Sequence, residues 1–431
     1  MNDREKRIPP DNKGSGDAAC VESRTAEKLR QAVLDARCDS AWTRVGGIPL
    51  VARSLWHLNK LGIEEVILLV DSGGRSTELG KWRGRLSLRE WRADRGAPVA
   101  PALLAVLSLA PRFLFLDCAH LMDPRIMAAL SAAQAPTLAC VDGDPEEGCA
   151  VRAGTLSIED LETWAAKGPA ALFRCSARLY PGDVDPFSPE IRGCRTPYFM
   201  EVRTADDAEK ATRLLIRSQQ KFVMDLPAEY IDPHFEDPLT HRLCGTFVTP
   251  NMVTMLGVLV AALIVTLFWH GHFVAGALLM FAVEILDGVD GKLARTTLHY
   301  TRLGHHEDVI DYFCETMIYV GLGVGLTARY GGNLPCVMTA LLIVSDTVDN
   351  TLYTLAGKWH GKSIDLFSPF DGAFRLIGGR RNIYGAMFIV GFIAGHPLPT
   401  LVLTAAWAAV TAAVHGVRLY QYGRAGARLS R

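Results

Sequence analysis

The chain lacks the features that mark several common classes of protein. The formal net charge of its 431 residues is −1, which by itself says nothing about nucleic acid, but no basic run interleaved with aromatics appears, and we expect no nucleic-acid partner. Its ten cysteines form no Cys-x-x-Cys pair, which argues for reduced thiols and against a zinc site. The polar N-terminus has no apolar run, so we expect no cleaved signal peptide and a disordered tail over residues 1–27.

The composition indicates a soluble part joined to a membrane part, because 49% of the residues are hydrophobic and 21% are still charged. Over residues 28–223, short apolar runs alternate with helical patterns, which predicts an α/β domain with a Rossmann-type sheet. The expected strands are 31–36, 65–70, 112–117 and 136–141. The expected helices are 49–61, 123–133 and 205–223.

A linker and an interfacial helix are expected over residues 224–248, with the helix at 234–246. An all-α, multi-pass membrane domain follows over 249–420, and a basic tail over 421–431. We predict six transmembrane helices from the apolar stretches near 252–269, 273–290, 309–328, 334–355, 383–396 and 398–417, although the fifth is short.

Basic residues are distributed unevenly between these stretches. The loops on one side of the membrane together carry a single basic residue, Arg329. The connections and the tail on the other side carry twelve: Lys292, Arg295, Arg302, Lys358, Lys362, Arg375, Arg380, Arg381, Arg418, Arg424, Arg428 and Arg431. Because Lys and Arg are enriched on the cytoplasmic side, we predict a cell-membrane protein with both termini and residues 284–315 at that side.

Two aspartates stand at the end of the second apolar stretch. On a helix, Asp287, Asp290, Gly291 and Ala294 lie on one face. Gly291 and Ala294 leave that face almost bare, so a ligand can approach the backbone.

A second acidic cluster, Glu307, Asp308 and Asp311, starts the next helix, with Glu307 and Asp311 one turn apart. Two facing helices would then hold four carboxylates around one point. Such a group cannot stay ionised beside a membrane without cations, and oxygen ligands suit Mg²⁺ or Mn²⁺. The alternative is an ordinary solvated charge cluster at a helix end.

These residues resemble the signature of the CDP-alcohol phosphotransferases, D-x2-D-G-x2-A-R-x8-G-x3-D-x3-D. The match covers Asp287, Asp290, Gly291, Ala294, Arg295 and Gly304. The match fails at the fourth aspartate position: Asp308 stands at the third position, but Tyr312 stands at the fourth. Taking Glu307 and Asp311 as the pair restores the one-turn spacing, which we prefer, and Asp308 remains the alternative ligand.

The resemblance implies a phosphotransferase that moves a substituted phosphate from a CDP-linked donor to an acceptor alcohol and releases CMP. The donor would be CDP-diacylglycerol or a CDP-polyol, and homodimers are common in the family. Two divalent cations would be held by Asp287, Asp290, Glu307 or Asp308, and Asp311, which is also the candidate base. The implied CDP contacts are Asp287, Gly291, Ala294, Arg295 and Asn251, the last from T-P-N-x-V-T at 249–254. Helix capping is the alternative role of Asn251.

The stretch GAFRLIGGRRNIYG at 372–385 is the candidate acceptor site. In the family, basic residues near this point receive the acceptor's phosphate, which suggests this role for Arg375, Arg380 and Arg381. The alternative is that the positive-inside rule alone requires these arginines. Asp346 and Asp349 lie in the fourth apolar stretch, where they either bind hydroxyls of a polyol or pair with Arg375 or Lys358.

The N-terminal domain shows a second resemblance. Residues 32–70, with VGGIPL, are similar to the opening of a sugar-phosphate nucleotidyltransferase. The order of the two domains is similar to that of bifunctional inositol-phosphate cytidylyltransferase/di-myo-inositol phosphate phosphate synthases. However, RCDSAWTR has no glycine where a phosphate loop is needed, and LDCAH keeps Asp117 but has Ala119 at an expected metal position. We therefore expect a degenerate domain; an active cytidylyltransferase, or a membrane protein that binds CDP-alcohols without turnover, remain the alternatives.

Overall fold

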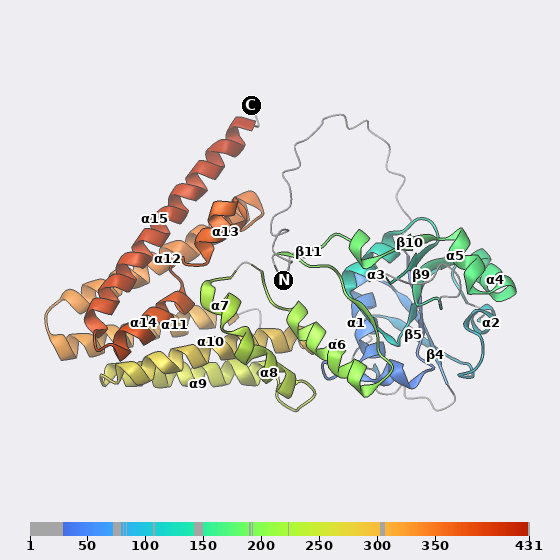
Figure 1. Ribbon diagram of the computed structural model, residues 1–431, viewed down its shortest axis with the longest axis horizontal. Helices are drawn as coiled ribbons and strands as arrows, with labels where there is room; N and C mark the ends of the chain where they lie inside the picture. The colour runs from blue at the N-terminus through green and yellow to red at the C-terminus, as the bar shows by residue number, and fades with distance from the viewer. Residues whose placement is uncertain are drawn as a thin grey trace. The chain divides into compact units, whose positions relative to one another are not determined.

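The computed structural model describes residues 29–71, 79–80, 82, 84–106, 108–141, 150–188, 191, 193–222, 224–301 and 307–429. The expected disordered tail and the pair His305 and His306 lie outside these ranges. The chain divides into two compact units (Figure 1). Unit 1 contains residues up to 189 together with 193–218, and unit 2 contains 190–192 and 219–431. Each is described by itself.

Unit 1 is built on a seven-stranded sheet in the order β10-β8-β9-β6-β1-β4-β5. Strand β9 runs antiparallel to β6 and β8, and the other pairs are parallel. The predicted α/β class is confirmed, and each predicted strand appears, the fourth one shortened. The strands are β1 (Gln31–Asp35), β4 (Glu65–Val70), β5 (Ser87–Arg92), β6 (Arg112–Asp117), β8 (Thr137–Ala139), β9 (Ala153–Ser157) and β10 (Ala177–Leu179).

Helices cover both faces of this sheet, as its apolar strands require (Figure 1). One face packs against α2 (Val99–Leu104), α4 (Ile158–Lys167) and α5 (Pro169–Cys175), around the buried Phe113 and Phe115. On the other side lie α1 (Leu50–Leu61) and α3 (Pro124–Ala132). The predicted helix 205–223 ends earlier, as α6 (Ala205–Ser218). The short elements are β2 (Arg44–Val45), β3 (Ile48–Pro49), β7 (His120–Met122), β11 (Phe187–Ser188), β12 (Gly193–Cys194), β13 (Phe199–Glu201), and the 3-10 turns η1 (Asp39–Trp42) and η3 (Pro181–Asp183).

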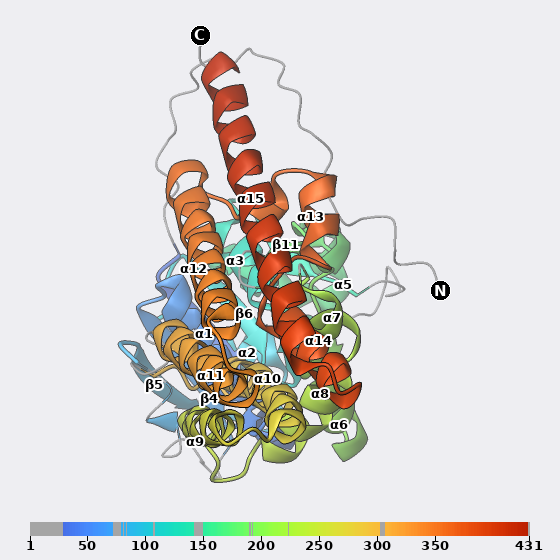
Figure 2. The same cartoon turned by 90° about the vertical axis from the view of Figure 1, so that its left-hand side faces the viewer.

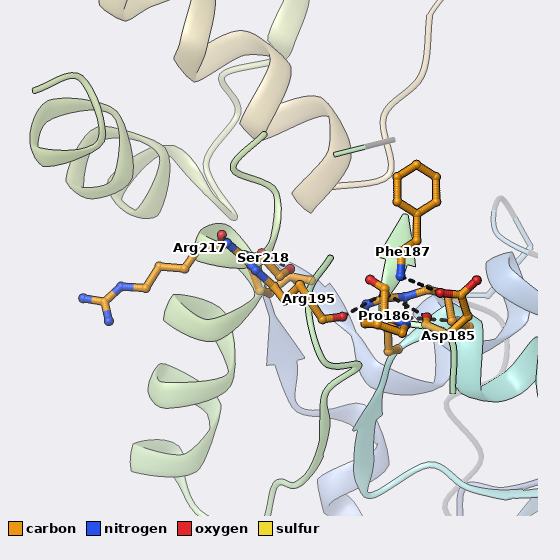
Figure 3. A network of polar contacts seen from close by, with 9 residues as sticks. Asp185, Pro186, Phe187, Arg195, Arg217 and Ser218 are labelled. Carbon is orange, nitrogen blue, oxygen red and sulfur yellow. Dashed lines mark hydrogen bonds and ion pairs between the residues drawn. The ribbon is translucent and has the colours of Figure 1, made fainter. Parts of the chain in front are cut away.

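A network of polar contacts stabilises the last part of unit 1 (Figure 3). The amide of Arg195 donates to the carbonyl of Pro186 over 2.8 Å, and the Arg195 guanidinium donates to the carbonyl of Arg217. The Arg125 guanidinium donates to the carbonyls of Pro186 and Arg195, at 2.7 and 2.9 Å. The β11–β12 hairpin is thereby tied to the last turn of α6, where unit 1 ends.

Unit 2 is helical in the residues that the structure describes. Helix α9 packs against both α10 and α11, and α12 runs alongside α15 (Figure 2). The core contains Phe268, Leu322 and Phe388, each fully buried. The helices are α7 (Leu226–Tyr230), α8 (Pro233–Leu243), α9 (Pro250–Trp269), α10 (Phe273–Thr296), α11 (Glu307–Tyr330), α12 (Leu334–His360), α13 (Pro369–Arg375), α14 (Arg381–Ile393) and α15 (Pro397–Leu429), with the turn η5 (Ile364–Leu366).

Within the described residues, three helices are long and apolar enough to cross a membrane: Pro250–Trp269, Val309–Tyr330 and Pro397–Arg424. These support a membrane protein. Helices α10 and α12 also occupy predicted spans but contain several buried acids, and α14 has only 13 residues. The number of six spans stays a prediction.

Two glycines let α9 and α11 approach closely. A Cβ on Gly321 would stand 2.9 Å from the carbonyl oxygen of Val265, and one on Gly325 would stand closer still to that of Phe268. The pair, four residues apart, has the spacing of a small-residue packing motif of membrane helices.

We therefore expect Gly325→Ala to force these helices apart and lower the thermal unfolding midpoint in detergent. Gly357→Ala is the matched control, since a Cβ there meets nothing within 4 Å in the helix α12. Equal midpoints for the two variants would contradict the close packing.

Candidate functional site

One cavity in unit 2 brings together acids from two helices. Its walls come from α9, α10 and α11, and the first residue of α14, Arg381, reaches it as well. Helix α10 supplies Asp287 and Asp290, and helix α11 supplies Asp311 and Glu315. The acids of α10 and those of α11, which belong to two separate stretches of the sequence, therefore face one space.

The contacts inside the cavity are direct. The carboxyl groups of Asp287 and Asp311 are hydrogen-bonded to each other. Asp287 also forms an ion pair with Arg381. The hydroxyl of Thr254 on α9 donates to Asp290 Oδ2 over 2.7 Å. Three helices and the start of a fourth thus hold the carboxylates in place.

The structure distinguishes between the two alignments of the second acidic cluster at one position. Asp311 lines the cavity, whereas the hydroxyl of Tyr312 lies 2.6 Å from the hydroxyl of Thr347 on α12. This favours the alignment in which Asp311, and not Tyr312, stands at the fourth aspartate position of the motif. Glu307 and Asp308 begin α11, four and three residues before Asp311, and the structure describes the backbone but not the side chains of these two residues. The choice between these two as the third acid therefore stays open.

The donor set suits a hard divalent cation, because Asp287 and Asp311 touch and Asp290 lines the same cavity. Two carboxyl groups in contact between apolar helices are an arrangement that a cation stabilises. No cluster of three or more His, Cys, Asp or Glu with metal-site geometry is found among the residues that the structure describes. Glu307 and Asp308 are the candidates for completing such a set, and their side chains are not among those that the structure describes.

The predicted nucleotide-contacting residues are only partly together. A Cβ on Gly291 would stand 3.2 Å from Arg295 Nη1, so the Arg295 guanidinium covers the bare face of α10. Ala294 is half-buried on the same face. Asn251 does not cap α9, which corrects that alternative: Thr249 is the cap, and its hydroxyl accepts from the amide of Met252. Asn251 Oδ1 instead accepts from the Thr301 hydroxyl over 2.8 Å.

The three candidate acceptor arginines separate into two groups. Arg381 reaches the acidic cavity, while Arg380 lies over the ring of Tyr353 on α12, 4.2 Å from its centroid. Arg375 is buried and lies 6.0 Å from the same ring. The separation arises because Arg380 precedes α14 in an extended conformation and Arg381 is already helical.

The expected pairing of Asp346 and Asp349 with Arg375 or Lys358 is not what the structure shows. Asp349 Oδ1 lies 2.5 Å from Nδ1 of His415 on α15, and both side chains are buried. Asp346 Oδ2 accepts from Asn350 over 3.1 Å within α12. These partners differ because α12 turns this face toward α15.

Three residues of the site were missed by the sequence reasoning. Glu315 follows Asp311 by one turn and accepts from the hydroxyl of Tyr319 over 2.5 Å. Glu284 precedes Asp287 by three residues and is 6% exposed. Thr254 is the last residue of T-P-N-x-V-T. Helical spacing from the motif aspartates was a usable signal for Glu284 and Glu315, whereas the Thr254 contact depends on packing.

Outside the predicted spans, the linker helices carry three further buried acids next to α10. Burial raises the pKa of Asp225 and of Glu236. Burial, together with the nearby Glu236 and Asp225, raises the pKa of Asp232 to about 7.

This pKa predicts a pH dependence. The folded state binds a proton at Asp232 more tightly than the unfolded state, whose ordinary pKa is 3.8. The stabilisation is present below that value and is lost as the pH rises through about 7. We expect Asp232→Asn to flatten the fall of the unfolding midpoint between pH 5 and 8 that the wild type shows. Unchanged pH dependence would contradict this, and Asp206→Asn, at an exposed ion pair, is the control.

The expected nucleotide site of unit 1 lies at the carboxyl ends of β1 and β6, where Asp35 and Asp117 are register partners. Ligands of such sheets bind at this edge. Here the Arg37 guanidinium pairs with both oxygens of Asp35, at 2.9 and 2.8 Å, and donates to the carbonyls of Asp94 and Ala97.

The segment at the position of a phosphate loop, which lacks the glycines such a loop needs, contains the 3-10 turn η1. Its Trp42 indole donates to the carbonyl of Ala36 over 3.0 Å. Asp117 accepts from the amide of Ala119 over 2.9 Å, and Nδ1 of His120 lies 3.3 Å from its Oδ2. The chain's own groups therefore occupy this strand edge.

Comparison with known proteins finds a family match over the part of the chain that contains the cavity. Residues 247–417 match the family model described as CDP-alcohol phosphatidyltransferase. A "Bifunctional IPC transferase and DIPP synthase" of Rubrobacter xylanophilus is 25% identical over 400 residues, covering 84% of this chain and 88% of that protein. A protein of the same name from Aquifex aeolicus is 28% identical over 148 residues, which cover 33% of each chain.

Among solved structures, a phosphatidylinositol phosphate synthase of Mycobacterium tuberculosis with CDP-DAG bound shares 21% identity and has a TM-score of 0.35, over 43% of this chain and 94% of that one. The inositol-1-phosphate CTP transferase from T. maritima shares 12% identity with a TM-score of 0.30, over 42% of this chain and 91% of that one.

The C-terminal half of the chain therefore contains a CDP-alcohol phosphotransferase domain, and the predicted class of enzyme is confirmed. The chain is similar along most of its length to the bifunctional IPC transferase and DIPP synthase of Rubrobacter xylanophilus.

Proposed function

We propose that the protein is an integral membrane enzyme that transfers a substituted phosphate group from a CDP-linked donor to the hydroxyl of a phosphorylated polyol, with release of CMP. Such a reaction belongs to phospholipid or polyol-phosphate synthesis. The observation that carries the proposal is the meeting of Asp287, Asp290 and Asp311 in one cavity within the matched domain.

Asp311 is the proposed base. It takes the proton from the acceptor hydroxyl, whose oxygen attacks the β-phosphorus of the donor while the bond to CMP breaks. Its hydrogen bond to Asp287 holds the carboxyl group of Asp311 inside the cavity. Arg295, lying over Gly291, is placed to receive the cytidine monophosphate portion.

Two divalent cations, Mg²⁺ or Mn²⁺, would supply charge neutralisation at the diphosphate when bound. Asp287, Asp290 and Asp311, with Glu307 or Asp308, are the residues that would hold them. Arg381 neutralises part of this acidic set from within the chain by its ion pair with Asp287.

The acceptor's phosphate is proposed to lie near Arg375 and Arg380. Nε and Nη1 of Arg375 donate no hydrogen bond within the described part of the chain, although the residue is 7% exposed. Both carboxylate oxygens of the buried Asp365 are equally without a partner there. Guanidinium groups bind phosphate and a carboxylate accepts from hydroxyls, which together fit a polyol phosphate.

We further propose six membrane crossings, with both termini and the acidic cavity on the cytoplasmic side. The asymmetry of basic residues supports this orientation. A homodimer is proposed from the resemblance alone.

The decisive assay is CMP release by the purified protein with Mg²⁺ or Mn²⁺. CDP-diacylglycerol and CDP-inositol are tested in parallel, each with inositol phosphate or glycerol phosphate. We expect release with one donor and its loss in Asp287→Asn. Donor binding without release under every pairing would instead indicate a protein that binds CDP-alcohols without turnover.

Asp311→Asn separates a base from a cation ligand. The amide cannot accept the proton, so turnover should be abolished while donor binding, measured by calorimetry, stays close to the wild type. Loss of donor binding with residual turnover would show that Asp311 serves only as a cation ligand and is not the base.

Unit 1 is proposed to be inactive as a cytidylyltransferase, because Arg37 and Trp42 bond to the strand ends where CTP would lie. We expect no pyrophosphate release from CTP with inositol phosphate. Release that disappears in Asp117→Asn would establish the bifunctional enzyme instead, which the likeness to the Rubrobacter xylanophilus protein over 84% of this chain allows.

A further inference from the structure

We propose that α8 is a positioning element of the active site, and that Glu236 acts through a notch at Gly288 to fix the rotation of α10. This inference rests on the proposed function for its catalytic consequence. The contact itself stands on geometry within unit 2.

Gly288 lies between the two motif aspartates, Asp287 and Asp290. A Cβ at this position would meet Glu236 Oε1 at 1.8 Å and Cδ at 2.2 Å. Glu236 therefore lies directly on the bare backbone of α10, and no other residue type than glycine leaves room for its carboxylate.

An ion pair holds this carboxylate. Lys292 follows Gly288 by four residues, so both lie on one face of α10. Its Nζ lies 2.9 Å from Glu236 Oε2 and 2.5 Å from Asp237 Oδ1. Lys292 is 2% exposed and Glu236 5% exposed, so the pair is shielded from solvent. Breaking a buried pair costs far more than breaking a surface pair.

Apolar contacts extend the seam, which is the interface between α8 and α10, on both sides of the notch. Phe235 meets Phe281 edge-on, with ring centroids 5.5 Å apart. Toward the other end of the helix, Leu239 and Leu243 pack against the cluster that contains Val289 and Leu293. Helix α8 is thus fixed along α10 on both sides of the notch.

The seam faces away from the cavity. Positions 288 and 292 lie on one face of α10, while Asp287 and Asp290 lie on a different face that lines the cavity. A rotation or shift of α10 against α8 would move both carboxylates together. A displacement of about 1 Å can lower a rate on the order of a hundredfold.

The test is a size exchange across the notch. We expect Gly288→Ala to lower kcat for CMP release on the order of a hundredfold. Glu236→Ala removes the clashing carboxylate and leaves Lys292 paired with Asp237, so the double variant should recover to the level of Glu236→Ala alone. Gly416→Ala is the control, because its Cβ would meet only Leu352 at 3.8 Å.

A double variant no better than Gly288→Ala, or a Gly288→Ala enzyme with wild-type kcat, would overturn the proposal. If Gly288→Ala does not fold, Glu236→Ala alone decides: a kcat below that of the Gly416→Ala control supports positioning, and a wild-type kcat refutes it. If the wild type releases no CMP, the proposed function fails by itself. The contact is then judged by unfolding midpoints, where non-additive shifts support it and additive shifts refute it.

Discussion

The arrangement of unit 2 depends on one electrostatic constraint, which is the burial of several carboxylates between apolar helices. Charged groups in such surroundings are costly unless opposite charges or hydrogen bonds compensate them. Here Arg381 compensates Asp287, Thr254 compensates Asp290, and Lys292 compensates Glu236. Each compensating group comes from a different helix than its acid, so the packing of the bundle and the charge state of the site are coupled.

This coupling explains the position of the linker helices. Helix α8 is not a passive connection, because its Glu236 and Leu239 lie against the motif segment of α10. The packing around the motif segment of α10 therefore extends upstream of the residues 247–417 that match the family model. In unit 1, the Arg37 guanidinium bonds to Asp35 at the strand edge where ligands of such sheets bind, so a group of the chain itself pairs with this carboxylate.

Much of this could be read from the sequence. The alternation of apolar runs predicts the strands β1, β4 and β6, and helical spacing brings Asp287 and Asp290 onto one face. Contacts between distant segments could not be read in this way. Asp349 pairs with His415, 66 residues away, and Asn251 bonds to Thr301, because the packing of whole helices decides which side chains meet. Likewise, Arg380 and Arg381 are adjacent in sequence but separate in space, because α14 begins between them.

The most direct test of the central claim, that acids of α10 and α11 form one cation-binding site, is the titration of Mn²⁺ into the purified protein, followed by electron paramagnetic resonance. This measurement needs neither the donor nor the acceptor. We predict saturable Mn²⁺ binding that is weakened alike by Asp290→Asn on α10 and by Asp311→Asn on α11. Binding that either variant leaves unchanged would contradict a shared site.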